Sequence, residues 1–169
     1  MVPGGHAIML SIALSRSIVT VARAWMQPRL SESKLHEPHV TVAFLGRNLP
    51  ESVGSRMLNI AEECLPLVPK HLEFPGRFSM FGPKRNHLVG IIEPSEPIMA
   101  LRSEIVRLAK EDGLRVNTTW TYRPHVTLAI SGSSAPLPNA EDFRLVAGIE
   151  KLPTNGFAVK IGSEIRKVI

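Results

Sequence analysis

A six-residue stretch that carries a histidine and a threonine occurs twice in this chain of 169 residues. The first copy, Pro-His-Val-Thr-Val-Ala, covers residues 38–43, and the second, Pro-His-Val-Thr-Leu-Ala, covers residues 124–129. Side chains alternate between the two faces of a β-strand, so the histidine, the threonine and the alanine of each copy are expected to share one face. The residues between them are apolar and form the other face.

Two such strands side by side would bring His39, Thr41, His125 and Thr127 into one cleft. A single histidine on an apolar strand is usually a structural residue. A core has no need of a matched pair of imidazoles, however, and burying four polar side chains without partners would cost roughly several kcal/mol. The repeat therefore predicts a site made of two histidines and two hydroxyls.

Catalysis at a phosphodiester fits this set of side chains. One imidazole can take a proton from water or an internal hydroxyl while the other protonates the leaving oxygen, because the pKa of histidine lies near neutral pH. Thr41 and Thr127 would donate hydrogen bonds to the non-bridging phosphate oxygens, which gain charge in the transition state. This mechanism requires no metal and no cofactor. The His-Glu-Pro-His stretch at 36–39 is not the helical metal-binding pattern, because its proline disfavours a helix.

The composition indicates a globular protein that binds anions. The formal net charge is +5 and the sequence pI is about 9.8, which favours phosphates or nucleic acid as partners, although no long Lys/Arg run marks a duplex-binding face. The single cysteine, Cys64, excludes an internal disulfide and a cysteine-cluster zinc site. The apolar run at 7–14 is too short to span a bilayer, and no basic residues precede it as in a signal peptide. We expect one soluble cytoplasmic domain over residues 1–169 that acts as a monomer with no predictable protein partner.

Hydrophobic spacing and turn residues predict the secondary structure. The expected strands cover 7–14, 38–46, 72–74, 78–81, 87–92, 124–130, 143–152, 157–161 and 164–169, and the expected helices cover about 15–27, 50–65 and 95–112. The Asn155-Gly156 pair predicts a tight hairpin turn. Each half thus has the order strand, helix, repeat strand. We predict a bilobal α+β fold with internal duplication, in which a V-shaped pair of antiparallel sheets encloses a central cleft and the helices lie outside.

The paired motifs, His-Val-Thr-Val at 39–42 and His-Val-Thr-Leu at 125–128, resemble those of the 2H phosphoesterase superfamily. The Phe-Leu-Gly that follows the first motif and the Tyr-Arg-Pro that precedes the second resemble the flanks usual in that family. The resemblance covers nearly the whole chain from Ala7 onward. It implies a bilobal, pseudo-two-fold α+β fold. The family includes 2′-5′ RNA ligase-like proteins, cyclic nucleotide phosphodiesterases and phage anti-CBASS enzymes.

The resemblance implies a metal-independent phosphodiesterase that acts on a 2′,3′-cyclic phosphate or a 2′-5′ linkage of a nucleotide or RNA end, with His39 and His125 as the acid–base pair. Hydrolysis of a small cyclic oligonucleotide signal is an alternative, and RNA 2′-5′ ligation is the same chemistry in reverse. A nucleotide-binding module without turnover is a further alternative. The intact histidines count against a pure binder, which has no need of two proton-transfer groups.

Five further residues are candidates for substrate binding. Tyr122 or Trp120 could stack on a base, with a core position equally expected for Tyr122 and favoured for Trp120. Phe81 could also stack, although its spacing favours the core. Lys84 and Arg123 could hold phosphates, or they could simply be solvated. The other histidines, His6, His36, His71 and His87, are expected to be structural or surface residues.

Overall fold

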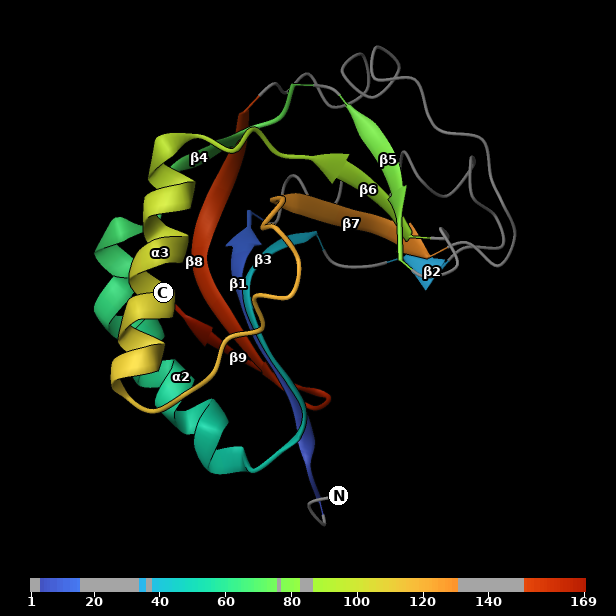
Figure 1. The fold of residues 1–169 in the computed structure, drawn as a ribbon. Helices are drawn as coiled ribbons and strands as arrows, with labels where there is room; N and C mark the ends of the chain where they lie inside the picture. The colour runs from blue at the N-terminus through green and yellow to red at the C-terminus, as the bar shows by residue number, and fades with distance from the viewer. Residues whose placement is uncertain (1–3, 16–33, 36–37, 76, 83–86, 131–150) are drawn as a thin grey trace.

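The computed structural model describes residues 4–15, 34–35, 38–75, 77–82, 87–130 and 151–169 (Figure 1). The elements in chain order are β1 (His6–Leu14), β2 (Lys34–Leu35), β3 (His39–Leu49), α2 (Glu51–Cys64), the short 3-10 helix η1 (Leu65–Leu67), β4 (His71–Glu73), β5 (Phe78–Phe81), β6 (His87–Ile91), α3 (Glu96–Glu111), β7 (His125–Ile130), β8 (Lys151–Ile161) and β9 (Glu164–Val168). The predicted helix at 15–27 lies outside the described residues except for Ser15, and the predicted strand at 143–152 lies outside them except for residues 151–152.

The described strands form one antiparallel path in the order β4-β8-β1-β3-β7-β6-β5, with β9 beside β8 and β2 beside β7. The predicted duplicated α+β fold is confirmed, and each half is built around one motif strand. The two halves are joined rather than separate, because β3 and β7 pair at Val40 and Val126. The strands β8, β1 and β3 lie on one side of this junction, and β7, β6 and β5 curl away on the other (Figure 1).

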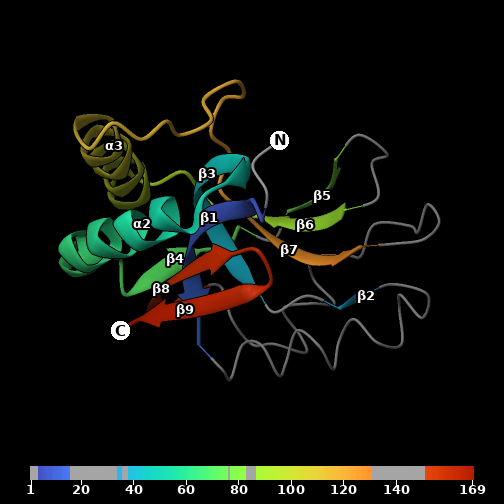
Figure 2. The same ribbon diagram turned by 90° about the horizontal axis from the view of Figure 1, so that it is seen from below.

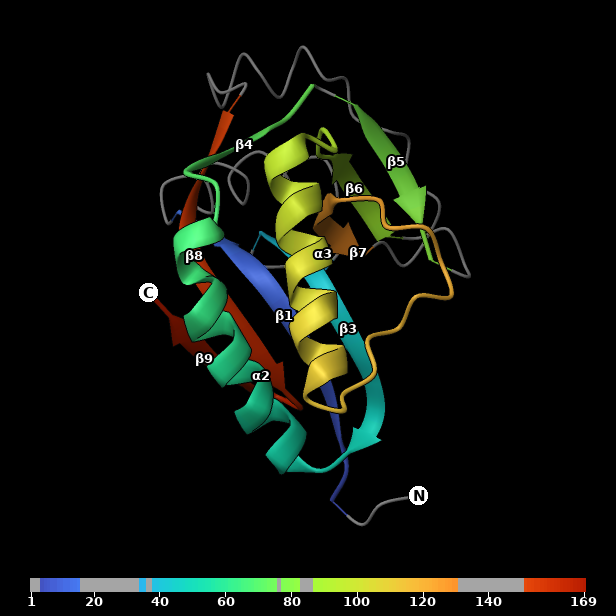
Figure 3. The same cartoon turned by 60° about the vertical axis from the view of Figure 1, so that its left-hand side comes forward.

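The two long helices cover the same part of the sheet. The α2 helix packs on β1 and β8, and α3 packs on β3 and α2 (Figure 3). Viewed from below, β5, β6 and β7 lie on the far side of the molecule from these helices (Figure 2). None of the helices in the described ranges is long and apolar enough to cross a membrane.

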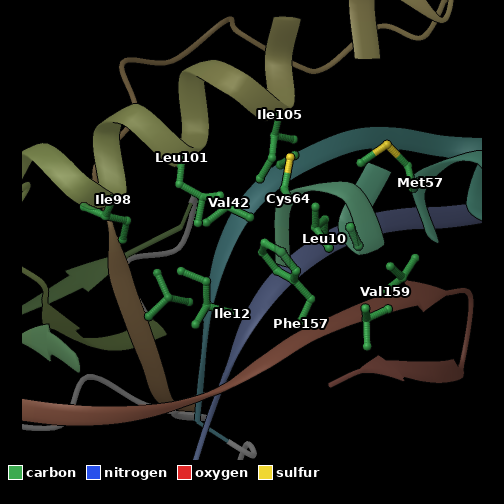
Figure 4. Packing of buried hydrophobic residues seen from close by; sticks show 14 of the residues in the cluster. Leu10, Ile12, Val42, Met57, Cys64, Ile98, Leu101, Ile105, Phe157 and Val159 are labelled. Carbon is green, nitrogen blue, oxygen red and sulfur yellow. The ribbon is translucent and has the colours of Figure 1, made fainter. Parts of the chain in front are cut away.

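The core fills the space between these helices and the strands. The buried face of α3 is formed by Ile98, Leu101, Ile105 and Ala109, which recur at the predicted helical spacing. Side chains from both helices meet those of the central strands in one cluster (Figure 4). The helices thus pack on the face of β1 and β3 that carries Leu10, Ile12, Val40 and Val42.

The predicted hairpin at Asn155-Gly156 is wrong. The β8 strand runs without interruption from Lys151 to Ile161, and these two residues form a bulge opposite Ala13 of β1. Gly156 has a φ of +69°, and an added Cβ would clash with the carbonyl oxygen of Val168. The Asn-Gly pair therefore supplies the positive φ of a bulge instead of a turn, and the chain reverses after Ile161, where β9 begins to pair with β8.

Candidate active site

The two motif strands lie side by side, and each begins at its histidine. In the antiparallel pairing of Val40 with Val126, the neighbouring positions place His39 opposite Thr127 and Thr41 opposite His125. The two valines are buried in the core that the helices cover. The alternation of side chains then places both histidines and both threonines on the opposite face of the sheet, where each histidine lies across from the threonine of the other copy.

Both copies have a β-bulge directly after the threonine. In β3 the register with β1 moves from Ser11–Thr41 to Leu10–Ala43, which leaves Val42 as the extra residue. In β7 the register with β6 makes the same step, from Val89–Thr127 to Leu88–Ala129. The bulge corrects one expectation, because Ala43 does not continue the polar face but is buried in the core.

The His125 ring is held on two sides. Its Nδ1 lies 2.7 Å from the carbonyl oxygen of Arg123, and because a carbonyl can only accept, Nδ1 carries the proton. The Phe81 ring lies edge-on to the imidazole, with 4.8 Å between ring centroids. Burial lowers the pKa of His125 below its ordinary value. The hydrogen bond to the Arg123 carbonyl opposes this change, and electrostatic repulsion from the neighbouring His39, Arg123 and His87 adds to it. The lowered pKa favours the neutral imidazole, and in that form Nε2 carries no proton because Nδ1 does.

Phe81 and Arg123 form one contact beside this histidine. The guanidinium of Arg123 lies over the Phe81 ring, 4.9 Å from its centroid. Phe81 is only partly buried, so the expectation that favoured the core for it is wrong. The ring connects the candidate catalytic histidine to a candidate phosphate-binding cation.

His87 is a residue that sequence reasoning missed. It pairs across the β5–β6 hairpin with Phe81, and it alternates along β6 with Val89 and Ile91, which pair with Thr127 and His125. His87 therefore lies on the same face as the motif histidines rather than at an unrelated surface. The predicted strands at 78–81 and 87–92 contained the signal, since pairing them as a hairpin across the five residues between them places His87 next to Phe81.

Thr41 is contacted through its side chain and its backbone. The Ser11 hydroxyl lies 3.4 Å from Thr41 Oγ1, which in turn lies 3.5 Å from the sulfur of Met9. The Tyr122 hydroxyl donates a 2.9 Å hydrogen bond to the Thr41 carbonyl oxygen. Burial raises the pKa of the Tyr122 hydroxyl well above its usual range, so it stays protonated and can donate.

Arg102 of α3 completes this support of the first motif. Its NH1 donates a 2.5 Å hydrogen bond to the carbonyl oxygen of Val42, the extra residue of the bulge. Its guanidinium also lies 4.9 Å from the centroid of the Tyr122 ring. Tyr122, predicted either to stack on a base or to lie in the core, thus packs against the core and holds the motif strand.

The remaining candidates lie elsewhere. Trp120 is 81% exposed, so its favoured core position is wrong. Lys84 lies outside the described residues. Cys64 is buried, and burial raises the pKa of its thiol to about 11, so it is no nucleophile. Among the described residues, no group of three or more His, Cys, Asp or Glu side chains is arranged to hold a metal ion.

Comparison with known proteins places this geometry in a family. The family model described as the 2′-5′ RNA ligase superfamily matches residues 12–155. The search of curated proteins finds no match to this chain. Solved structures with the same fold include apo E. coli LigT, with a TM-score of 0.66 at 15% identity over 97% of this chain and 94% of that one. The structure of TT0787 of Thermus thermophilus has a TM-score of 0.62 at 19% identity, over 95% of this chain and 97% of that one. The MHV ns2 PDE domain has a TM-score of 0.61 at 16% identity, over 93% of this chain and 99% of that one.

Proposed function

The chain belongs to the 2′-5′ RNA ligase superfamily, also named the 2H phosphoesterases, and we propose that it is a metal-independent phosphodiesterase acting on nucleotides or RNA ends. The favoured substrates carry a 2′,3′-cyclic phosphate or a 2′-5′ linkage. One observation carries the proposal: the Val40–Val126 pair sets each histidine across from the threonine of the other copy. Four groups suited to proton transfer and phosphate binding then face one substrate phosphate.

His125 acts as the general base in this mechanism. Its Nδ1 proton is fixed on the Arg123 carbonyl, and its burial among positive groups favours the neutral ring, so Nε2 can accept a proton from water. The water oxygen forms a bond to phosphorus as the bond to the leaving ribose oxygen breaks. His39, as imidazolium, gives its proton to that oxygen. Thr41 and Thr127 donate hydrogen bonds to the non-bridging oxygens, and the product is a phosphate monoester.

The second half of the sheet binds the rest of the substrate. Arg123 supplies positive charge on the His125 side of the site, and among the described residues no acidic group contributes to the pKa of His125. The Arg123 guanidinium lies over the Phe81 ring, and its N–H groups can donate to a phosphate oxygen. E. coli LigT has been solved with 3′-AMP and with ATP, which supports a nucleotide as the ligand. The exposed Trp120 is available to stack on a base.

Hydrolysis of a substrate panel in EDTA tests the proposal. The panel holds 2′,3′-cyclic mononucleotides, RNA with a cyclic phosphate end, 2′-5′ dinucleotides, and cyclic di- and trinucleotides. Wild-type turnover is expected to survive EDTA and to fall by about 10²- to 10⁴-fold in both His39→Ala and His125→Ala.

The panel also separates the alternatives. Preference for the cyclic di- or trinucleotides would replace the favoured substrate class with immune-signal hydrolysis. Joining of a 2′,3′-cyclic phosphate end to a 5′-hydroxyl RNA end would show the ligase direction. Nucleotide binding without turnover at any pH would show a binding module instead. Turnover retained by either alanine variant would remove that histidine from the mechanism.

A further inference from the structure

The β1 strand brings two side chains to the first motif threonine. Ser11 and Met9 are two residues apart on β1 and so share a face, and both lie within contact of Thr41 Oγ1. Ser11 is 4% exposed and is the only polar residue among the fully buried side chains of the described part of the chain. A polar group is rarely buried without a hydrogen-bond partner, and here the partner belongs to a candidate catalytic residue.

The proton positions follow from what each group can accept. A hydroxyl has one proton to donate and two lone pairs that accept. Donation from the buried Ser11 to Thr41 Oγ1 occupies one Thr41 lone pair, so the Thr41 proton must point elsewhere. Thr41 Oγ1 lies 3.5 Å from the Met9 sulfur, which can accept this proton, and a thioether is a weak acceptor. A phosphate oxygen is a much stronger acceptor and would take that proton readily.

We propose that Ser11 is a positioning residue that sets the direction of the Thr41 proton. Its hydroxyl donates to Thr41 Oγ1, so that Thr41 is left as a donor aimed at a non-bridging oxygen of the substrate phosphate, which displaces the Met9 sulfur. The 3.4 Å separation shortens when the phosphate polarises the Thr41 hydroxyl. This inference rests on the proposed function, because it requires a phosphate beside Thr41.

The second motif lacks this arrangement. The bulges of the two copies align Ser11 of β1 with Val89 of β6, since each lies opposite the motif threonine immediately before the bulge. Val89 is fully buried and its side chain has no hydrogen-bonding group. Thr127 therefore receives no hydroxyl from the equivalent position. The two threonines are predicted to respond differently to changes in the strand beside them.

A double-mutant cycle tests the proposal. The parameters kcat and KM are measured on the preferred panel substrate for Ser11→Ala alone and combined with Thr41→Val, with Thr127→Val as the matched control background. Ser11→Ala is expected to lower kcat by about 3- to 10-fold with KM within about two-fold, in the wild-type and the Thr127→Val backgrounds. In the Thr41→Val background the same change should have no further effect on kcat. Ser11→Thr, which keeps the hydroxyl, should restore most of the wild-type kcat.

The outcomes separate this inference from the proposed function. An equal loss in both threonine backgrounds would show that Ser11 only packs the strand, and an unchanged kcat would show that it does nothing to Thr41. Thermal unfolding of each variant is followed in parallel, and Ser11→Cys replaces Ser11→Ala if the alanine variant unfolds. A wild-type chain inactive on the whole panel would overturn the proposed function and this inference together, whereas an active one with additive variants overturns this inference alone.

Discussion

The two motif strands share their sequence and their bulge, yet the protein supports them in different ways. In the first copy the support reaches the threonine: Ser11 and Met9 contact its side chain, and Tyr122 contacts its carbonyl. In the second copy the support reaches the histidine, through the Arg123 carbonyl and the Phe81 ring. A duplicated sequence therefore does not give duplicated environments, because the neighbouring strands are different.

Under the proposed function, this difference would give the two copies separate roles. A fixed tautomer and a lowered pKa suit His125 to accept a proton, which leaves proton donation to His39. A threonine contacted on its side chain and its backbone suits Thr41 to bind the phosphate. The residues outside the motifs thus decide what each copy does, and changes to those residues can test the assignment.

The leaving group of the substrate should separate the two histidines most strongly. On a ribose leaving group, His39→Ala and His125→Ala each lose about 10²- to 10⁴-fold in kcat/KM. On a nucleoside nitrophenyl phosphodiester, which needs no general acid, the loss in His39→Ala should shrink to within about ten-fold while His125→Ala stays impaired. Measuring kcat/KM for both variants on both substrates checks this. If the nitrophenyl substrate restored kcat/KM in His125→Ala and not in His39→Ala, His125 would be the general acid and His39 the general base.

Removing the support of the first copy should cost stability as well as activity. Arg102→Met leaves the Val42 carbonyl of the bulge without its donor, so the free energy of unfolding should fall by about 1–3 kcal/mol. Tyr122→Phe loses one neutral hydrogen bond and should cost about 1 kcal/mol. Denaturant unfolding measures both. Arg107→Met, at an exposed position of the same helix, is the control, and an equal loss there would show that the bulge contact contributes nothing.

Changing a charge in the second copy should move its pH dependence. Because the pKa of His125 is lowered by burial and by neighbouring cations, the acid limb of kcat/KM is expected below the ordinary histidine range near 6.5. A base loses activity as pH falls through its pKa, so Arg123→Gln, which removes one cation and keeps the backbone carbonyl, should move that limb to higher pH. The pH profile of kcat/KM measures this. Arg107→Gln is the control and should leave the acid limb in place. An acid limb that also stays in place in Arg123→Gln would show that Arg123 does not affect the pKa of His125.

The smallest effect on stability is expected outside both copies. Trp120 is exposed, so Trp120→Ala should change the free energy of unfolding by less than about 0.5 kcal/mol. Denaturant unfolding checks this. A raised KM at unchanged stability would identify its ring as a surface for a base, and a loss of several kcal/mol would contradict its exposure.

The sequence was sufficient to predict what depends on local spacing. The strand alternation around His39 and His125 and the helical stripe of Ile98, Leu101 and Ile105 follow from neighbours along the chain, and the fold class follows from the element order. The positions of the bulges depend instead on pairing between strands that are far apart in the sequence. The bulge that buries Ala43 comes from the register with β1, and Asn155 could be placed in a bulge only once β8 was seen to continue along β1.

The site residues that sequence reasoning missed have the same origin. Ser11 interrupts an apolar run, and His87 begins a short strand, so neither has a local pattern that marks a function. Each lies near the motifs only because its strand pairs with a motif strand, β1 with β3 and β6 with β7. The prediction that placed Trp120 in the core was wrong for another reason. An aromatic residue in a loop has no periodicity that distinguishes the core from the surface.

The narrow junction between the halves has a mechanical consequence. The β3 strand is paired with β1 along its whole length, and β7 is paired with β6, but the two motif strands share the single pair Val40–Val126 in the described part of the sheet. The backbone connection between the two motif strands in the described residues is therefore one residue pair, and it lies between the two histidines. A rotation about this pair would change the separation of the two imidazoles, and it would also disturb the shared core, in which Val40 and Val126 are both buried.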